Sequence, residues 1–178
     1  LCALNLSPVG TASAQEIKHH VFGNATEALI LSIEGELQEG FTARFLSYHE
    51  TEYPEGYQVV LHSPGGNLLE GIKLGYTLRE FGYHTRVGRV VYSENSAGYS
   101  MPEEREGQCL SACALAFLGG TVRDVRSAEA VGFHQFYGGA REAAMSSDTR
   151  EKLYTRTQSI AQMLSGVIVQ YIVEMGVD

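Results

Sequence analysis

The segment from Tyr57 to Phe81 constrains the fold more than any other part of the sequence. Its first residues, 57–62, form a short apolar run of the kind found in strands, and the chain then turns sharply at 63–66, which reads Ser-Pro-Gly-Gly. After the turn, apolar residues recur at helical spacing up to Phe81. The segment therefore predicts a strand, a tight glycine turn and a helix.

The same alternation continues along most of the chain. Further strands are expected over 28–33, 83–87 and 130–136, and further helices over 41–48, 111–120 and 142–175. Strands that alternate with helices indicate an α/β fold with a parallel sheet and right-handed crossovers. The 178 residues are enough for one domain with a hydrophobic core, which we place over 15–178.

Residues 89–108 interrupt this alternation. The stretch is polar, rich in Ser, Glu and Gly, and contains Pro102 without a clear apolar period. We expect an inserted loop there, which either forms a lid over a binding site or is a surface excursion without a role.

The net charge argues against two classes of partner. The chain carries 21 acidic and 13 basic side chains, which gives a formal charge of −8. This field would repel nucleic acids and anionic lipid headgroups, so we expect binding to neither. Beyond the N-terminal segment, no stretch approaches the roughly 20 apolar residues of a membrane helix, so no integral membrane segment is expected in the mature protein.

Residues 1–14 resemble the rear half of a secretory signal. An apolar start gives way to small residues just before Gln15, where a signal peptidase would cut after Ala14. Such a cut would export the protein to the periplasm or out of the cell, whereas the alternative is a disordered N-terminal tail. The sequence begins without methionine and stops at Asp178 without a closing element, so we expect both ends to be truncated.

Export with cleavage would remove Cys2 and leave Cys109 and Cys113 in a compartment where disulfides persist. At positions i and i+4 of a helix the Cβ atoms lie about 5–6 Å apart, whereas a disulfide needs about 3.8 Å. A bond therefore requires Cys109 to lie just before the helix that begins near Ser111. A disulfide and a pair of buried free thiols both stay open.

Two segments offer groups for acyl-transfer chemistry. In the 63–66 turn, the N–H groups of Gly65 and Gly66 can converge on an oxygen without side chains in the way, as half of an oxyanion hole. Ser111 stands at the start of a predicted helix of mostly small residues, and the N–H of Ala112 would add a further donor. Taken alone, the two segments are also compatible with an ordinary turn and a helix-capping serine.

His134 could supply the base that such a serine needs. It lies on an otherwise apolar predicted strand, 23 residues after Ser111. A serine hydroxyl is a weak nucleophile at neutral pH, and a neutral imidazole has a suitable pKa to remove its proton. A lone histidine on such a strand would otherwise be a core residue.

In order and spacing, these three segments resemble the proteolytic subunit of the Clp protease, a serine peptidase of the crotonase-like superfamily. The similarity covers residues 28–175. The family's Ser-Pro-Gly-Gly turn corresponds to 63–66, its active-serine segment to 110–112 and its His-Gln pair to 134–135. Each motif alone is common, whereas the ordered set of three is fairly specific.

The resemblance assigns a role to each candidate residue. It implies Ser111 as nucleophile, His134 as general base, and the amides of Gly65, Gly66 and Ala112 as the oxyanion hole. It also implies a crotonase-like α/β fold of repeated β-β-α units with a parallel sheet and a long C-terminal helix. Family members associate through that helix, so a homo-oligomer is compatible with it. No metal and no cofactor are implied, and the expected substrate is a peptide or an unfolded protein.

The family's third catalytic residue is an aspartate that orients the histidine, and it follows the long helix. Here Asp178 is the last residue and no safe match. An exported protein would also lack a cytosolic ATP-driven unfoldase. We therefore expect action on peptides or chains that are already unfolded.

Three other functions stay open. Signal peptide peptidases use a lysine as base, and Lys152 is the only lysine after Ser111, although an exposed, solvated side chain is the simpler interpretation of it. A catalytically inactive peptide-binding module could keep the same fold. An acyl-thioester enzyme of the crotonase superfamily is the third, but neither active-site segment carries an acidic residue suited to it.

Overall fold

The computed structural model describes residues 16–22, 28–52, 58–133 and 147–177. Its largest sheet has the strand order β1-β2-β3-β4-β8, in which β1 is antiparallel to β2 and the other neighbours are parallel. The strands of this sheet are β1 (Glu16–Phe22), β2 (Ala28–Glu34), β3 (Gln58–His62), β4 (His84–Val87) and β8 (Arg123–Asp124).

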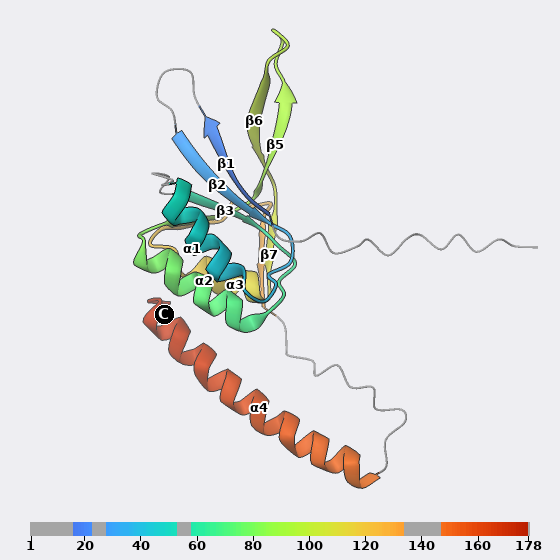
Figure 1. Ribbon diagram of the computed structural model, residues 1–178. Helices are drawn as coiled ribbons and strands as arrows, with labels where there is room; N and C mark the ends of the chain where they lie inside the picture. Colours follow the sequence, from blue (N-terminus) through green and yellow to red (C-terminus); the bar gives the residue numbers. More distant parts are fainter. Residues whose placement is uncertain (1–15, 23–27, 53–57, 134–146, 178) are drawn as a thin grey trace, which may run out of the picture.

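Two strand pairs and four helices complete the described part of the chain. β5 (Arg89–Glu94) pairs with β6 (Ser100–Arg105) antiparallel, and β7 (Gln108–Leu110) pairs with β9 (Ala130–Gly132) parallel. The helices are α1 (Phe41–Glu52), α2 (Leu68–Glu80), α3 (Ala112–Leu118) and α4 (Ser147–Glu174). Figure 1 shows α1, α2 and α3 grouped together beside the sheet, with α4 extending away from them.

The central strand β3 is buried on both of its faces. Residues 59 and 61 belong to the main core, whereas Val60 joins Ile30 and Val90 in a smaller cluster. Burial on both sides is typical of a strand inside a parallel sheet and explains its continuous apolar run. The predicted α/β fold with parallel strands and a C-terminal helix is confirmed, and the repeated units of the Clp type stay a prediction.

α3 packs against α2 with almost no space between their backbones. All residues of α3 are buried. A Cβ on Gly71 of α2 would collide with the backbone of Ala112, and a Cβ on Gly119 would collide with the backbone of Gly75. Because glycine omits the side chain at these crossings, the start of α3 is held directly against α2.

Asn67 and Glu70 fix the start of α2. The Asn67 side chain accepts from the N–H groups of Leu69 and Glu70, at 3.0 and 3.2 Å, and caps the helix. The buried Glu70 carboxylate accepts from the Thr42 N–H at 2.9 Å and from Lys73 Nζ at 3.0 Å. Burial by itself would raise the pKa of Glu70, but the hydrogen bonds from Thr42 and Lys73 outweigh it and lower this pKa to about 2. The carboxylate therefore ties α1 to α2 just after the glycine turn.

The prediction of a loop over 89–108 is wrong. β5 and β6 form a hairpin that extends away from the helices, and β7 follows it (Figure 1). The Asn95 side chain closes the hairpin turn by accepting from the N–H groups of Ala97 and Tyr99, both at 3.0 Å. The β-branched and aromatic residues of β5 and this asparagine turn are hairpin signals. The high Ser and Glu content concealed them, because a two-stranded ribbon tolerates polar residues on its exposed faces.

The edge strand β1 was also not predicted. Its side chains are mostly charged or histidine, and His20 is the one that is buried. His20 Nε2 lies 2.8 Å from the Ser32 hydroxyl on β2, and Nδ1 lies 3.0 Å from the Tyr92 hydroxyl on β5. Burial lowers the pKa of His20, so the neutral ring connects the edge strand to β2 and to the hairpin.

The C-terminal end of α4 contacts the rest of the domain. Tyr171 and Met175 are buried there, and the Tyr171 hydroxyl donates to the Leu115 carbonyl of α3 at 2.6 Å. The Met175 carbonyl accepts from the guanidinium groups of Arg79 and Arg123. These contacts attach the end of α4 to α2 and α3.

Among the described side chains of α4, the apolar ones that are buried in the core lie at this end. Leu164 is half-buried and Val167 is exposed, while the side chains of Leu153 and Ile160 lie outside the described residues. Among the α4 side chains that the structure describes, the exposed large apolar ones are Met163, Val167, Val169 and Val173. Within the described ranges, neither α4 nor any other helix is long and apolar enough to cross a membrane.

Candidate active site

β3 and β7 bring the two predicted active-site segments side by side. The Ser63 N–H, at the end of β3, donates to the Gln108 carbonyl at 2.8 Å, and the Leu110 N–H donates back to the Ser63 carbonyl at 3.0 Å. The 63–66 turn and Ser111 therefore leave neighbouring parallel strands at the same edge. In α/β proteins, this carboxyl-terminal edge is where ligands usually bind.

Ser111 has a strained backbone conformation at the junction of β7 and α3. Its φ is 57° and its ψ −121°, and within the described ranges it is the only non-glycine residue with positive φ. Such conformations cost about 1–3 kcal/mol and persist where their surroundings fix them. Here the Ser111 N–H donates to the Gly132 carbonyl at 2.7 Å, and the Ser111 carbonyl accepts from the Ala114 N–H at 3.0 Å. A sharp, strained strand-to-helix turn is a known way to present a nucleophilic serine.

The Ser111 hydroxyl is not used to hold the fold together. It does not cap α3, and no hydrogen bond among the described residues involves its oxygen. A Cβ on Gly65 would lie 2.7 Å from the Ser111 Cβ and 3.3 Å from its Oγ. Because Gly65 also has a φ of +112°, this position requires glycine for both conformation and space. The serine side chain thus lies directly against the glycine turn.

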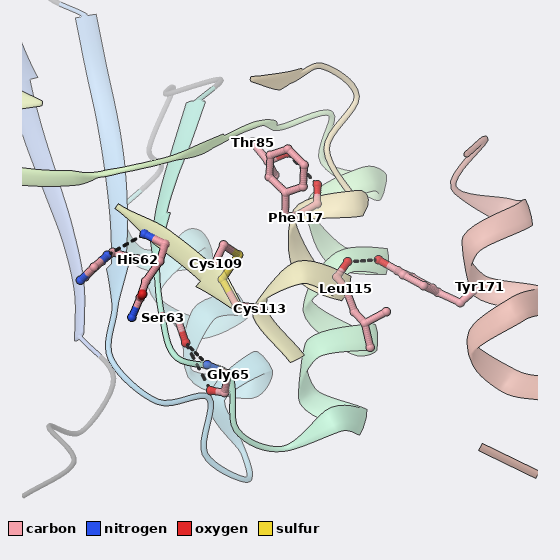
Figure 2. The surroundings of a disulfide bond; sticks show 10 residues. His62, Ser63, Gly65, Thr85, Cys109, Cys113, Leu115, Phe117 and Tyr171 are labelled. Atoms are coloured by element: carbon pink, nitrogen blue, oxygen red, sulfur yellow. Dashed lines mark hydrogen bonds between the residues drawn. A yellow bond between two sulfur atoms is a disulfide. The ribbon is translucent and has the colours of Figure 1, made fainter. Parts of the chain in front are cut away.

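Two of the three predicted oxyanion-hole amides have no acceptor in the described part of the chain. The Gly65 N–H donates to the Ser63 hydroxyl at 3.1 Å, and that hydroxyl donates to the Gly65 carbonyl at 3.2 Å (Figure 2). No hydrogen bond among the described residues uses the N–H of Gly66 or of Ala112. Gly65 therefore provides space beside Ser111, whereas Gly66 and Ala112 provide available donors.

The backbone of Leu37 also holds the glycine turn. Its N–H donates to the Gly65 carbonyl and its carbonyl accepts from the Asn67 N–H, both at 2.7 Å. Gly66 lies between these two bonds with a φ of +131°, and a Cβ there would collide with the Leu37 backbone. Since backbone groups on both sides of Gly66 are bonded, the direction of its own N–H is fixed.

A disulfide joins Cys109 of β7 to Cys113 of α3 across Ser111 (Figure 2). The two Cα atoms are 5.1 Å apart, and both cysteines are almost completely buried. This geometry is accessible because Cys109 lies on β7, before α3 begins at Ala112, which is the condition that the sequence sets. The cross-link therefore closes a short loop with Ser111 at its centre.

His134 and Asp178, the candidate base and the last residue of the chain, lie outside the described residues. The nearest described element is β9, which ends at Gly132. The Gly132 carbonyl accepts the Ser111 N–H, and His134 is the second residue after Gly132 in the sequence.

Lys152, the alternative base, belongs to α4. It precedes Tyr171 by 19 residues, which corresponds to about 28 Å along a helix with a rise of about 1.5 Å per residue. Tyr171 contacts α3 through the Leu115 carbonyl. The backbone of Lys152 is therefore about 28 Å along α4 from this contact with α3.

His62 is a residue of this region that the sequence patterns did not single out. Its Nδ1 accepts from the Gln108 N–H at 3.1 Å, and burial lowers its pKa. A backbone donor on Nδ1 leaves the proton of the neutral ring on Nε2. His62 thus joins β3 to β7 beside the turn, and its position directly before the Ser-Pro-Gly-Gly sequence is the signal that could have identified it.

A hollow of about 600 Å³ lies at the base of the hairpin, and Ser111 does not line it. Its lining is made mostly of charged residues: Arg89, Glu104, Arg105, Glu106, Arg126, Ser127, Ala128 and Glu129. Opposite charges pair there: Glu104 lies 3.3 Å from Arg126, and 3.0 Å from Arg86, which does not line the hollow. Among the described residues no group of three or more His, Cys, Asp or Glu could hold a metal ion.

Comparison with known proteins gives little similarity. No protein-family model matches this chain, and no curated protein sequence matches it. A solved structure of a putative enoyl-CoA hydratase from Streptomyces coelicolor A3(2) is similar with a TM-score of 0.33 and 10% sequence identity. The similar region covers 70% of this chain and 52% of the hydratase, so the chain spans about half the length of that protein. At this TM-score the similarity carries no argument about function.

Proposed function

We propose that the protein is a serine peptidase of the Clp type, with Ser111 as nucleophile and His134 as general base. One observation carries the proposal: a serine in a strained strand-to-helix turn lies against the glycine turn with its hydroxyl unused by the fold. A strained backbone at a residue with no structural hydrogen bond from its side chain is typical of functional sites. The ordered sequence motifs point to the same residue.

The groups around Ser111 suit transfer of the acyl group of a peptide to the serine hydroxyl and then to water. In the proposed reaction, Ser111 Oγ attacks the carbonyl carbon while His134 removes the hydroxyl proton. The N–H groups of Gly66 and Ala112 then donate to the oxyanion, and His134 returns the proton to the leaving amine. Water hydrolyses the acyl-enzyme in the second half-reaction. Loss of one oxyanion donor typically lowers kcat by about 10²–10³-fold.

The proposed base is His134 rather than Lys152. The sequence places His134 two residues after Gly132, whose carbonyl is bonded to Ser111 itself. The backbone of Lys152 lies about 28 Å along α4 from Tyr171, whose hydroxyl is bonded to α3. A base must reach within hydrogen-bond distance of the nucleophile, directly or through one water.

We also propose that the protein works outside the cytoplasm, on peptides or unfolded chains. A buried disulfide next to the active serine is compatible with an oxidising compartment, because such bonds rarely persist in a reducing cytosol. The signal-like sequence of residues 1–14 points the same way. Without an ATP-driven unfoldase there, the substrate must already be extended.

Hydrolysis of an unfolded protein and of a peptide library tests this proposal. We expect cleavage by the wild type, loss of at least about 10³-fold in Ser111→Ala and in His134→Ala, and no change in the control Lys152→Gln. Loss of activity in Lys152→Gln with full activity in His134→Ala would instead assign a lysine base. Peptide binding without any cleavage would show a binding module and would overturn the enzymatic proposal.

A further inference from the structure

The Cys109–Cys113 disulfide imposes a sharp reversal on the chain around Ser111. An extended strand advances about 3.3 Å per residue, so four residues that continued β7 would span about 13 Å. The cross-link instead holds the two Cα atoms 5.1 Å apart. The chain must therefore turn between the cysteines, and Ser111 is the residue there with positive φ.

Backbone hydrogen bonds constrain Ser111 together with the disulfide. The Ser111 N–H is bonded to Gly132, and its carbonyl accepts from Ala114 in the first turn of α3. The side chain contributes no bond, so it does not hold φ in this region. Both cysteines are almost completely buried, and their disulfide joins β7 to α3 (Figure 2).

We propose that this disulfide is a positioning device for Ser111. By fixing Cys109 against Cys113, it holds Ser111 at positive φ and keeps the hydroxyl beside Gly65. The two cysteines are positioning residues, because they act through the backbone of Ser111 and make no hydrogen bond to its Oγ. The reactivity of Ser111 therefore depends on the cross-link, and this part of the inference rests on the proposed function.

A purely stabilising disulfide would behave differently. Its removal would lower the free energy of unfolding and leave the Ser111 backbone and its reactivity unchanged in the folded protein. A measurement on folded protein therefore separates the two roles. The matched control is Phe117→Ala, which removes buried side-chain volume from the same helix at a position outside the cross-linked loop.

The experiment compares the wild type, Cys109→Ala/Cys113→Ala and Phe117→Ala at a temperature where circular dichroism shows each to be folded. Nuclear magnetic resonance gives the Ser111 φ, and a fluorophosphonate probe gives the rate at which Ser111 is labelled. We expect Ser111 to leave positive φ in the double variant and its labelling rate to fall by about tenfold or more, whereas Phe117→Ala keeps both at wild-type values.

Retention of positive φ and of the wild-type labelling rate in the double variant would overturn the inference. If the wild type itself is not labelled, the proposed function fails, and the φ measurement alone decides whether the disulfide positions Ser111. Should the double alanine variant not fold, Cys109→Val/Cys113→Ala, which restores most of the lost volume, is measured in its place under the same criteria.

Discussion

Replacing Gly65 by alanine tests how the glycine turn makes room for Ser111. The added methyl group would lie 2.7 Å from the Ser111 Cβ and 2.8 Å from the Leu110 carbonyl oxygen. Since a Cβ and a backbone oxygen cannot move aside by rotating a side chain, the turn and the β7–α3 junction must separate. Alanine is also strained at the Gly65 φ of +112°.

The cost of the steric contacts and the cost of the strained conformation can be separated by the same substitution at a second glycine. The conformation costs about 1–3 kcal/mol and the forced contacts add about 1–3 kcal/mol, so Gly65→Ala should lower the free energy of unfolding by about 2–6 kcal/mol. Gly40 has a φ of +79°, but a Cβ there would have no neighbour within 4 Å. Gly40→Ala therefore carries the conformational cost alone, about 1–2 kcal/mol.

Thermal unfolding followed by circular dichroism gives the comparison. In a chain of this size 1 kcal/mol changes Tm by about 2–4 °C, so a loss of about 4 kcal/mol in Gly65→Ala lowers Tm by about 8–16 °C, and Gly40→Ala lowers it by about 2–8 °C. At a temperature where both variants are folded, fluorophosphonate labelling should be lost in Gly65→Ala alone. Equal losses of Tm and of labelling in the two variants would refute the assignment of Gly65 to the space beside Ser111.

Two further predictions concern the supports of the site. In the folded protein the pKa of Glu70 is about 2, below its ordinary value of 4.5. The ionised carboxylate therefore stabilises the folded protein by about 3 kcal/mol above pH 4.5, and this stabilisation is lost as the pH falls towards 2. Urea unfolding should show Glu70→Gln less stable than the wild type at pH 7 and much closer to it at pH 3; an equal difference at both pH values would contradict this. Tyr171→Phe should cost about 1–3 kcal/mol because it removes the buried bond to the Leu115 carbonyl, and should speed limited proteolysis within α4. The control Tyr99→Phe, at a side chain that is 68% exposed, should stay within about 0.5 kcal/mol, and equal costs for the two tyrosines would be evidence against this anchor.

The parts of the fold that the sequence predicts are those with strong local patterns. β3, the glycine turn and α2 could be recognised because two-sided burial gives a continuous apolar run, and the turn residues and helical period follow it without interruption. The strand β2 and the helix α3 could also be recognised, because each is a continuous run of mostly apolar residues. These elements carry both predicted active-site segments to one edge of the sheet.

The missed parts depend on tertiary contacts. β1 is an edge strand whose buried residue is a histidine, so its apolar pattern is too weak to distinguish it from a tail. The hairpin is polar on its exposed faces, and its turn is stabilised by one asparagine side chain. The Ser111 φ could not be predicted either, because it results from a reversal between two elements and not from the preference of serine itself.

Covalent labelling of Ser111 is the most direct test of the proposed peptidase. The full chain, with its disulfide formed, is treated with a fluorophosphonate, and the adduct is located by mass spectrometry of a digest. The expected result is a single adduct on Ser111 that is absent in Ser111→Ala and forms at least about 10²-fold more slowly in His134→Ala. No adduct on the folded wild type, or an adduct that persists in Ser111→Ala, would contradict the role of Ser111 as nucleophile.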